Sequence, residues 1–123
     1  MKTILVVEDD KLLGRTLCSF LEKAGFGVFW AESAKAAFEA LSVQVIDLVF
    51  MDIMMPEMDG FTALKEIRLS KKYGNVPVVM LTNLSESCEM EKSKNLGATD
   101  FIVKANMDMS ELVDRIHRQY LPE

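Results

Sequence analysis

The chain has 123 residues, of which 50% are hydrophobic and 27% charged, a composition typical of one globular domain over residues 1–123. Its formal net charge of −5 argues against a nucleic-acid-binding face. The N-terminal apolar run is too short for a signal peptide, and no run approaches the ~18 apolar residues of a membrane span, so we expect a cytoplasmic protein. Cys18 and Cys88 match no CxxC motif and are interpreted as small buried or half-buried hydrophobic residues in a reducing compartment.

The first half of the chain alternates predicted strands and helices. Residues 3–7 are a short apolar, β-branched run, typical of a strand buried on both faces. Apolar residues then recur at helical spacing over residues 11–24. A second strand is predicted at residues 28–31, a helix that begins at a capping serine at residues 33–41, and a third buried strand at residues 48–51.

The second half continues the alternation after a loop that contains proline and glycine. Helical spacing resumes over residues 61–68, and residues 76–81 predict a fourth strand. A polar helix is predicted over residues 85–96, a fifth strand at 101–103 and an amphipathic helix at 110–120. The polar helix has little apolar surface, so we expect it to pack weakly and to be able to move.

Five strand–helix alternations predict an α/β fold. The expected architecture is a single doubly wound parallel sheet of five strands, with five helices distributed over both faces. In such sheets, ligands bind beyond the carboxyl ends of the strands. The polar residues at those ends are therefore the candidate site residues: Glu8, Asp9, Asp10, Asp52, Thr82, Asn83 and Lys104.

These side chains suggest a phosphoryl-binding site with a metal ion. Several carboxylates that meet in one crevice repel one another, and a hard cation with oxygen ligands, such as Mg²⁺, relieves that repulsion. Lys104 adds an ammonium group and Thr82 a hydroxyl donor. A carboxylate, a cation, an ammonium and a hydroxyl around one point suit a tetrahedral phosphoryl group.

Four segments in chain order carry a family resemblance: ILVVEDD, DLVFMDIMMPEMDG, PVVMLT and GATDFIVK. With them, the chain resembles the receiver domain of two-component response regulators along essentially its whole length. The resemblance implies a flavodoxin-like fold with strand order 2-1-3-4-5. It also implies a signalling domain in a phosphorelay, which is not an enzyme acting on other substrates and catalyses only its own phosphorylation and dephosphorylation.

The resemblance assigns a metal and phosphorylation site. Asp52 is the implied phosphoacceptor, which takes the phosphoryl group from phosphohistidine on a sensor histidine kinase or a histidine phosphotransfer protein. Glu8, Asp9, Asp52 and the backbone carbonyl of Met54 are the implied Mg²⁺ ligands. Asp10 is interpreted instead as a charge in the first turn of a helix.

The same resemblance assigns the catalytic lysine and the switch. Lys104 would pair with a phosphoryl oxygen, Thr82 would hydrogen-bond to the phosphoryl group, and Phe101 would rotate inward behind it. A plain core role is the alternative interpretation of Phe101. Helix four, strand five and helix five would form the output face for an output domain or downstream protein.

A homodimer that forms on phosphorylation is a further implication of the resemblance. Asp100, Glu111 and Arg115 match part of the family's set of dimer salt bridges, whereas Met90 stands where a basic partner is expected. We expect no direct contact with nucleic acid and none with a membrane.

Three positions depart from the family pattern. Lys104 is followed by Ala105 instead of proline, so a trans peptide is expected. Asn83 replaces a very small residue. Met54 and Leu84 are apolar at the two positions that flank the attacking water, which predicts a long-lived phosphorylated state.

Other classes of protein fit less well. A flavin-binding flavodoxin needs a phosphate loop after the first strand, where this chain has acidic residues. A haloacid-dehalogenase-type phosphatase needs an acid at the position of Met54. A pseudo-receiver that binds proteins without being phosphorylated stays open as the alternative.

Overall fold

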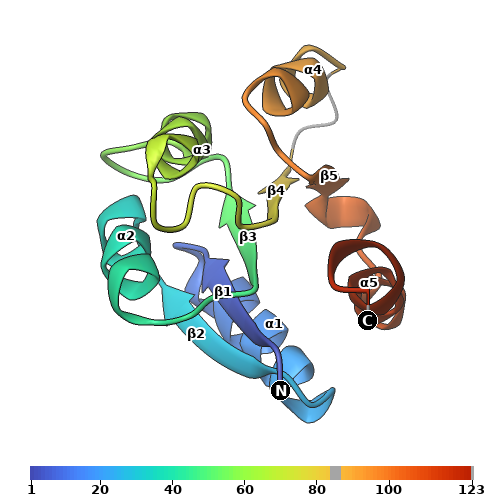
Figure 1. Cartoon of the computed structure of the whole chain (residues 1–123). Coiled ribbons are helices and arrows are strands. Elements are labelled where there is room, and N and C mark those ends of the chain that lie inside the picture. The colour runs from blue at the N-terminus through green and yellow to red at the C-terminus, as the bar shows by residue number, and fades with distance from the viewer. Residues whose placement is uncertain (84–86, 123) are drawn as a thin grey trace.

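The sheet has five parallel strands in the order β2-β1-β3-β4-β5 (Figure 1). The protein is described here by a computed structural model that covers residues 1–83 and 87–122, without the side chains of residues 87 and 88. The strands are β1 (Thr3–Val7), β2 (Gly27–Ala31), β3 (Leu48–Asp52), β4 (Val78–Thr82) and β5 (Asp100–Val103). The predicted flavodoxin-like α/β fold, with strand order 2-1-3-4-5, is confirmed.

Helices cover both faces of this sheet. They are α1 (Lys11–Lys23), α2 (Ala34–Val43), α3 (Gly60–Leu69), α4 (Ser87–Asn95) and α5 (Met109–Arg115). Buried residues of α1 and α5 pack with one face of the sheet, and those of α2 and α3 with the other. β3 and β4 are buried along their entire length, as their apolar sequences predict.

The last helix differs from the prediction of one regular helix over residues 110–120. It continues beyond α5 as a π-helical segment, η2 (Ile116–Tyr120). Leu112, Ile116 and Tyr120 are all buried at four-residue spacing. A regular helix has 3.6 residues per turn, so side chains four residues apart point in successively different directions around its axis. One wider, π-helical turn keeps all three side chains facing the sheet.

Strand four begins later than predicted. Val76 belongs to a turn, because its N–H donates to the carbonyl of Tyr73 at 3.1 Å. Pro77 follows and has no N–H for a strand ladder, so β4 begins at Val78. The first two residues of the predicted helix 85–96 lie outside the described residues, as does the side chain of Cys88.

The core fixes the place of the site. Cys18 is buried, as expected, and burial together with the charge of Glu22 raises the pKa of its thiol to about 11. Because all five strands run in one direction, the residues at their carboxyl ends meet along one edge of the sheet.

Within the described part of the chain, no helix is long and apolar enough to cross a membrane.

Candidate functional site

Three carboxylates meet at the carboxyl ends of β1 and β3. Glu8 and Asp9 directly follow β1, and Asp52 ends β3. One carboxylate oxygen from each lies within 4.8 Å of the other two. Glu8 is fully buried and Asp52 is 3% exposed, whereas Asp9 is exposed to solvent. The structure thus brings together the three acidic residues that the sequence predicts as metal ligands.

Lys104 reaches this cluster from the end of β5. Its Nζ lies 2.6 Å from Glu8 Oε1 and 3.1 Å from Asp52 Oδ1. It is the first residue of a 3₁₀ turn, η1 (Lys104–Asn106). Every peptide bond among the described residues is trans, including Lys104–Ala105, and the ammonium still contacts both carboxylates.

The electrostatics of the cluster favour a cation. Burial, and then the contact and charge of Glu8, raise the pKa of Asp52 to about 7, although Lys104 acts in the opposite direction. Burial lowers the pKa of Lys104, but its hydrogen bonds and its attraction to Glu8 and Asp52 raise the pKa above its usual value overall. One ammonium does not neutralise three carboxylates, so an oxygen-binding divalent ion fits the donor set.

Backbone hydrogen bonds hold the acidic segment after β1. The N–H of Glu8 donates to the carbonyl of Ala31 at 3.0 Å, and the N–H of Asp10 donates to Glu8 Oε2 at 3.2 Å. Asp10 Oδ1 accepts from the first N–H groups of α1, so Asp10 is the N-cap of that helix instead of a residue of its first turn. The indole Nε1 of Trp30 donates to the carbonyl of Glu8 at 3.0 Å, a contact that the sequence analysis missed.

The loop between β3 and α3 folds back onto Asp52. The N–H of Met54 donates to Asp52 Oδ1 at 3.4 Å, and the Met54 side chain is 63% exposed. A Cβ at Gly60 would collide with the carbonyl of Asp52, and the Gly60 N–H donates to Ile53 O at 2.8 Å. Gly60 therefore permits a close backbone approach, beyond the simple turn role that its sequence position suggests.

The predicted switch residues come from β4 and β5. Thr82 ends β4 and is fully buried, and Phe101 in β5 is half-buried against the core on the α2 and α3 side. Asn83 is exposed, and Leu84 lies outside the described residues. These positions leave both interpretations of Phe101 open, as switch residue and as core residue.

Comparison with known proteins assigns the family. Residues 4–117 match the model of the response regulator receiver domain. The chain therefore belongs to the receiver-domain family of two-component response regulators, signalling domains of phosphorelay systems that bind Mg²⁺ at an acidic pocket.

Two curated relatives of the chain are named as transcriptional regulatory proteins. The chain is 37% identical over 117 residues to the transcriptional regulatory protein CrdR of Helicobacter pylori, covering 95% of this chain and 54% of that protein. It is 40% identical over 116 residues to a CpxR homolog of Haemophilus influenzae, covering 94% of this chain and 49% of that protein. The chain thus spans about half the length of these relatives.

Solved structures share the fold along nearly the whole chain. The receiver domain of Francisella response regulator 1452 superposes with a TM-score of 0.88 at 28% identity, over 98% of this chain and 97% of that one. The Vibrio cholerae chemotaxis protein CheY4 superposes with a TM-score of 0.90 at 27% identity, over 97% of this chain and 98% of that one. These likenesses agree with the family assignment.

Proposed function

We propose that Asp52 accepts a phosphoryl group from a phosphohistidine of a sensor histidine kinase or a histidine phosphotransfer protein. The observation that carries this proposal is the set of three carboxylates within 4.8 Å, two of which contact Lys104. A carboxylate oxygen of Asp52 attacks phosphorus, the P–N bond breaks, and the imidazole leaves with the electron pair. Lys104 pairs with the phosphoryl oxygens as charge develops on them.

Mg²⁺ is the cofactor that this donor set fits. Glu8, Asp9, Asp52 and the backbone carbonyl of Met54 would hold it. When bound, the ion supplies positive charge that offsets the repulsion between the carboxylates and the incoming phosphate. Lys104 then remains available to the phosphoryl group, because the cation takes over its charge compensation of Glu8.

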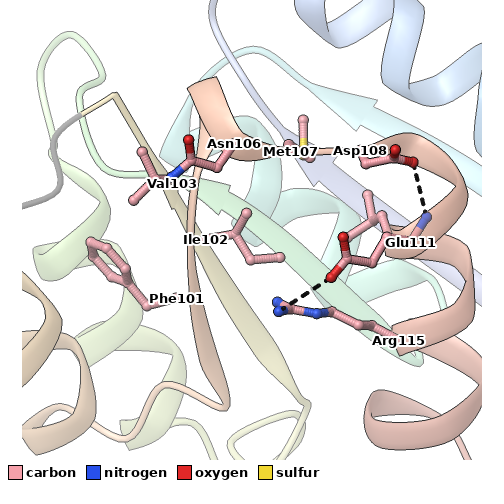
Figure 2. A pocket seen from close by; sticks show the side chains of 9 residues that line it. Phe101, Ile102, Val103, Asn106, Met107, Asp108, Glu111 and Arg115 are labelled. Carbon is pink, nitrogen blue, oxygen red and sulfur yellow. Dashed lines mark hydrogen bonds and ion pairs between the residues drawn. The ribbon is translucent and has the colours of Figure 1, made fainter.

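Phosphorylation would move Thr82 and Phe101, and through them it would change the face formed by α4, β5 and α5. A pocket of about 190 Å³ lies on this face, between β5 and α5. Figure 2 shows its lining residues, with Arg115 directed toward Glu111. Arg115 lies 3.7 Å from both Asp100 and Glu111 within the chain. We propose this face as the docking surface for an output domain, a downstream protein or a second copy. Sedimentation of the phosphorylated protein tests the last case: a monomer at tens of micromolar would count against the dimer.

The remaining parts of the proposal concern the whole chain. Residues 1–123 would form one receiver domain that works in the cytoplasm, contacts neither nucleic acid nor membrane, and catalyses only its own phosphorylation and dephosphorylation. Acidic residues and a lysine occupy the site positions that phosphorylation needs, and this favours the proposed function over a pseudo-receiver that only binds proteins.

Mass spectrometry after incubation with acetyl phosphate and Mg²⁺ tests the site. The wild type should gain one phosphoryl mass, and the Asp52→Asn variant should gain none. Asp9→Ala should lose Mg²⁺ binding and phosphorylation together. Asp10→Ser is the matched control, because serine keeps the helix cap while removing a neighbouring charge. Phosphorylation of Asp52→Asn would reject the assignment, and an unmodified wild type would favour the pseudo-receiver.

A further inference from the structure

We propose that Trp30 is a positioning residue for the Mg²⁺ site. Its indole N–H holds the peptide between Glu8 and Asp9, and this keeps the Asp9 carboxylate directed toward the cation. The inference rests on the proposed binding of Mg²⁺ by Glu8, Asp9 and Asp52, and it assigns a role to a residue outside that set.

The contact links a neighbouring strand to the acidic segment. Trp30 lies in β2, in register with Val6 of β1. Its side chain runs past the end of β1, where Nε1 donates to the carbonyl of Glu8 at 3.0 Å. The N–H of Glu8 already donates to Ala31 of the same strand at 3.0 Å. The backbone of Glu8 is thus tied to β2 on both sides of its Cα.

Asp9 depends on its backbone more than the other two carboxylates do. Glu8 and Asp52 are buried, and Lys104 contacts both. Asp9 is exposed, and no hydrogen bond or ion pair between described residues involves its carboxylate. A fixed peptide immediately before Asp9 therefore limits the directions in which this side chain can point. Partners that orient metal ligands in this way commonly control metal affinity.

Helix α1 has a glycine, Gly14, where it faces the Trp30 indole. A Cβ at Gly14 would lie 2.5 Å from Trp30 Cε2 and 2.7 Å from Nε1, closer than van der Waals contact permits. Glycine is unfavourable inside a helix, yet Gly14 lies within α1 and is buried. Gly14 thus leaves the space in which Trp30 reaches the carbonyl of Glu8, and the pair acts as one unit.

Calorimetric titration with Mg²⁺ tests the inference. Trp30→Phe keeps an aromatic ring but removes the N–H, and it should weaken Mg²⁺ binding roughly tenfold. Gly14→Ala should also weaken binding, since the added methyl displaces the indole. In the Trp30→Phe background, Gly14→Ala should have no further effect. The matched control is Phe29→Leu, because Phe29 is an exposed aromatic residue on the same strand. This variant should leave the affinity for Mg²⁺ unchanged.

A spectroscopic measurement separates positioning from packing. Trp30 is the only tryptophan, so its indole N–H gives one assignable NMR resonance. This resonance should shift with Mg²⁺ saturation in the wild type and stay constant in Asp9→Asn. Wild-type affinity in both Trp30→Phe and Gly14→Ala would overturn the role of Trp30 and leave the proposed function intact. A wild type that binds no Mg²⁺ would overturn both.

Discussion

The two helices on either side of the acidic cluster are held in different ways. α1 follows the acidic segment, buries Leu17, Cys18 and Leu21, and begins at the side-chain cap of Asp10. α4 lies beyond the Thr82 end of β4 (Figure 1), and Ser93 is the only buried residue among its described side chains. The metal side of the site thus rests on apolar packing, and the phosphoryl side borders a helix with almost none.

Polar contacts hold α4 in place of an apolar core. Lys92 Nζ lies 4.5 Å from the ring centroid of Phe61 in α3. The hydroxyl of Ser93, the one buried residue among the described side chains of α4, donates within the helix itself, to Glu89 O at 2.9 Å. The turn after α4 is fastened by Arg68, whose Nε donates to Gly97 O at 2.9 Å. A helix held by contacts of this kind unfolds locally at a lower free energy than one held by buried apolar packing. A fixed metal side beside a loosely held helix suits a domain that binds a cation and then moves.

The largest expected effect compares the two helices directly. Leu17→Ala should lower the free energy of unfolding by about 3 kcal/mol, because the side chain is fully buried and leaves a cavity. Met90→Ala in α4, where the side chain is 41% exposed, should change it by less than about 0.5 kcal/mol. Urea unfolding of both variants measures this, and equal losses would remove the distinction between the helices.

Arg68 should be the strongest single anchor of the α4 side. Besides Gly97, it donates to the carbonyls of Gly74 at 3.0 Å and Val76 at 2.6 Å. Arg68→Met should cost about 2 kcal/mol, since three carbonyls lose a charged donor. Hydrogen exchange should speed up in α4 more than in α1. The control is Arg118→Met, because the ion pair of Arg118 with Asp114 is exposed and contributes little. Equal protection loss in both helices would show that Arg68 supports the whole fold instead.

Features that local sequence patterns encode could be predicted, and contacts between distant elements could not. The alternation of strands and helices and the meeting of Glu8, Asp9, Asp52 and Lys104 could be predicted, because short apolar runs and their polar ends encode them locally. The strand order was implied by the family resemblance. The Trp30 contact could not, since it depends on register between strands and on the space above another helix.

Two other features also escaped the sequence analysis for physical reasons. The collision that Gly60 avoids arises from the path of the backbone, and the sequence marks only a flexible residue there. The π-helical end of the chain depends on which side chains the sheet accepts, and an amphipathic pattern predicts only a helix. Long-range packing therefore decides what local patterns leave open.

The exposed side of the site should set the lifetime of the phosphorylated form. Met54 is 63% exposed beside Asp52 and cannot orient an attacking water, whereas an amide can. Met54→Asn should speed the loss of the phosphoryl group about tenfold, a barrier change of about 1.4 kcal/mol. A dephosphorylation time course in excess Mg²⁺ measures this, with Met90→Asn as the control. An unchanged half-life would show that Met54 does not limit the reaction.

Asp52 itself should reduce stability in the absence of metal. Burial and the neighbouring Glu8 raise its pKa to about 7 in the folded protein, above the ordinary value of 3.8, so the folded state binds the proton more tightly between these values. Stability therefore falls as pH rises from about 4 to about 7. Asp52→Asn lacks this loss and should be more stable than the wild type at pH 8 by on the order of 1 kcal/mol in EDTA. Thermal unfolding against pH measures the difference, and a gap that is constant with pH would contradict the assignment.

The smallest expected effect concerns the contact between α4 and α3. The Lys92 ammonium lies over the Phe61 ring at the surface, where such a contact contributes about 0.5 kcal/mol. Lys92→Gln should raise hydrogen exchange in α4 about twofold while leaving global unfolding in urea almost unchanged, because α4 can open without the rest of the domain. Lys94→Gln, on the same helix, is the matched control for charge. If Lys92→Gln instead lowers global stability and leaves exchange in α4 unchanged, the helix opens only with the whole domain, and the contrast between α1 and α4 does not hold.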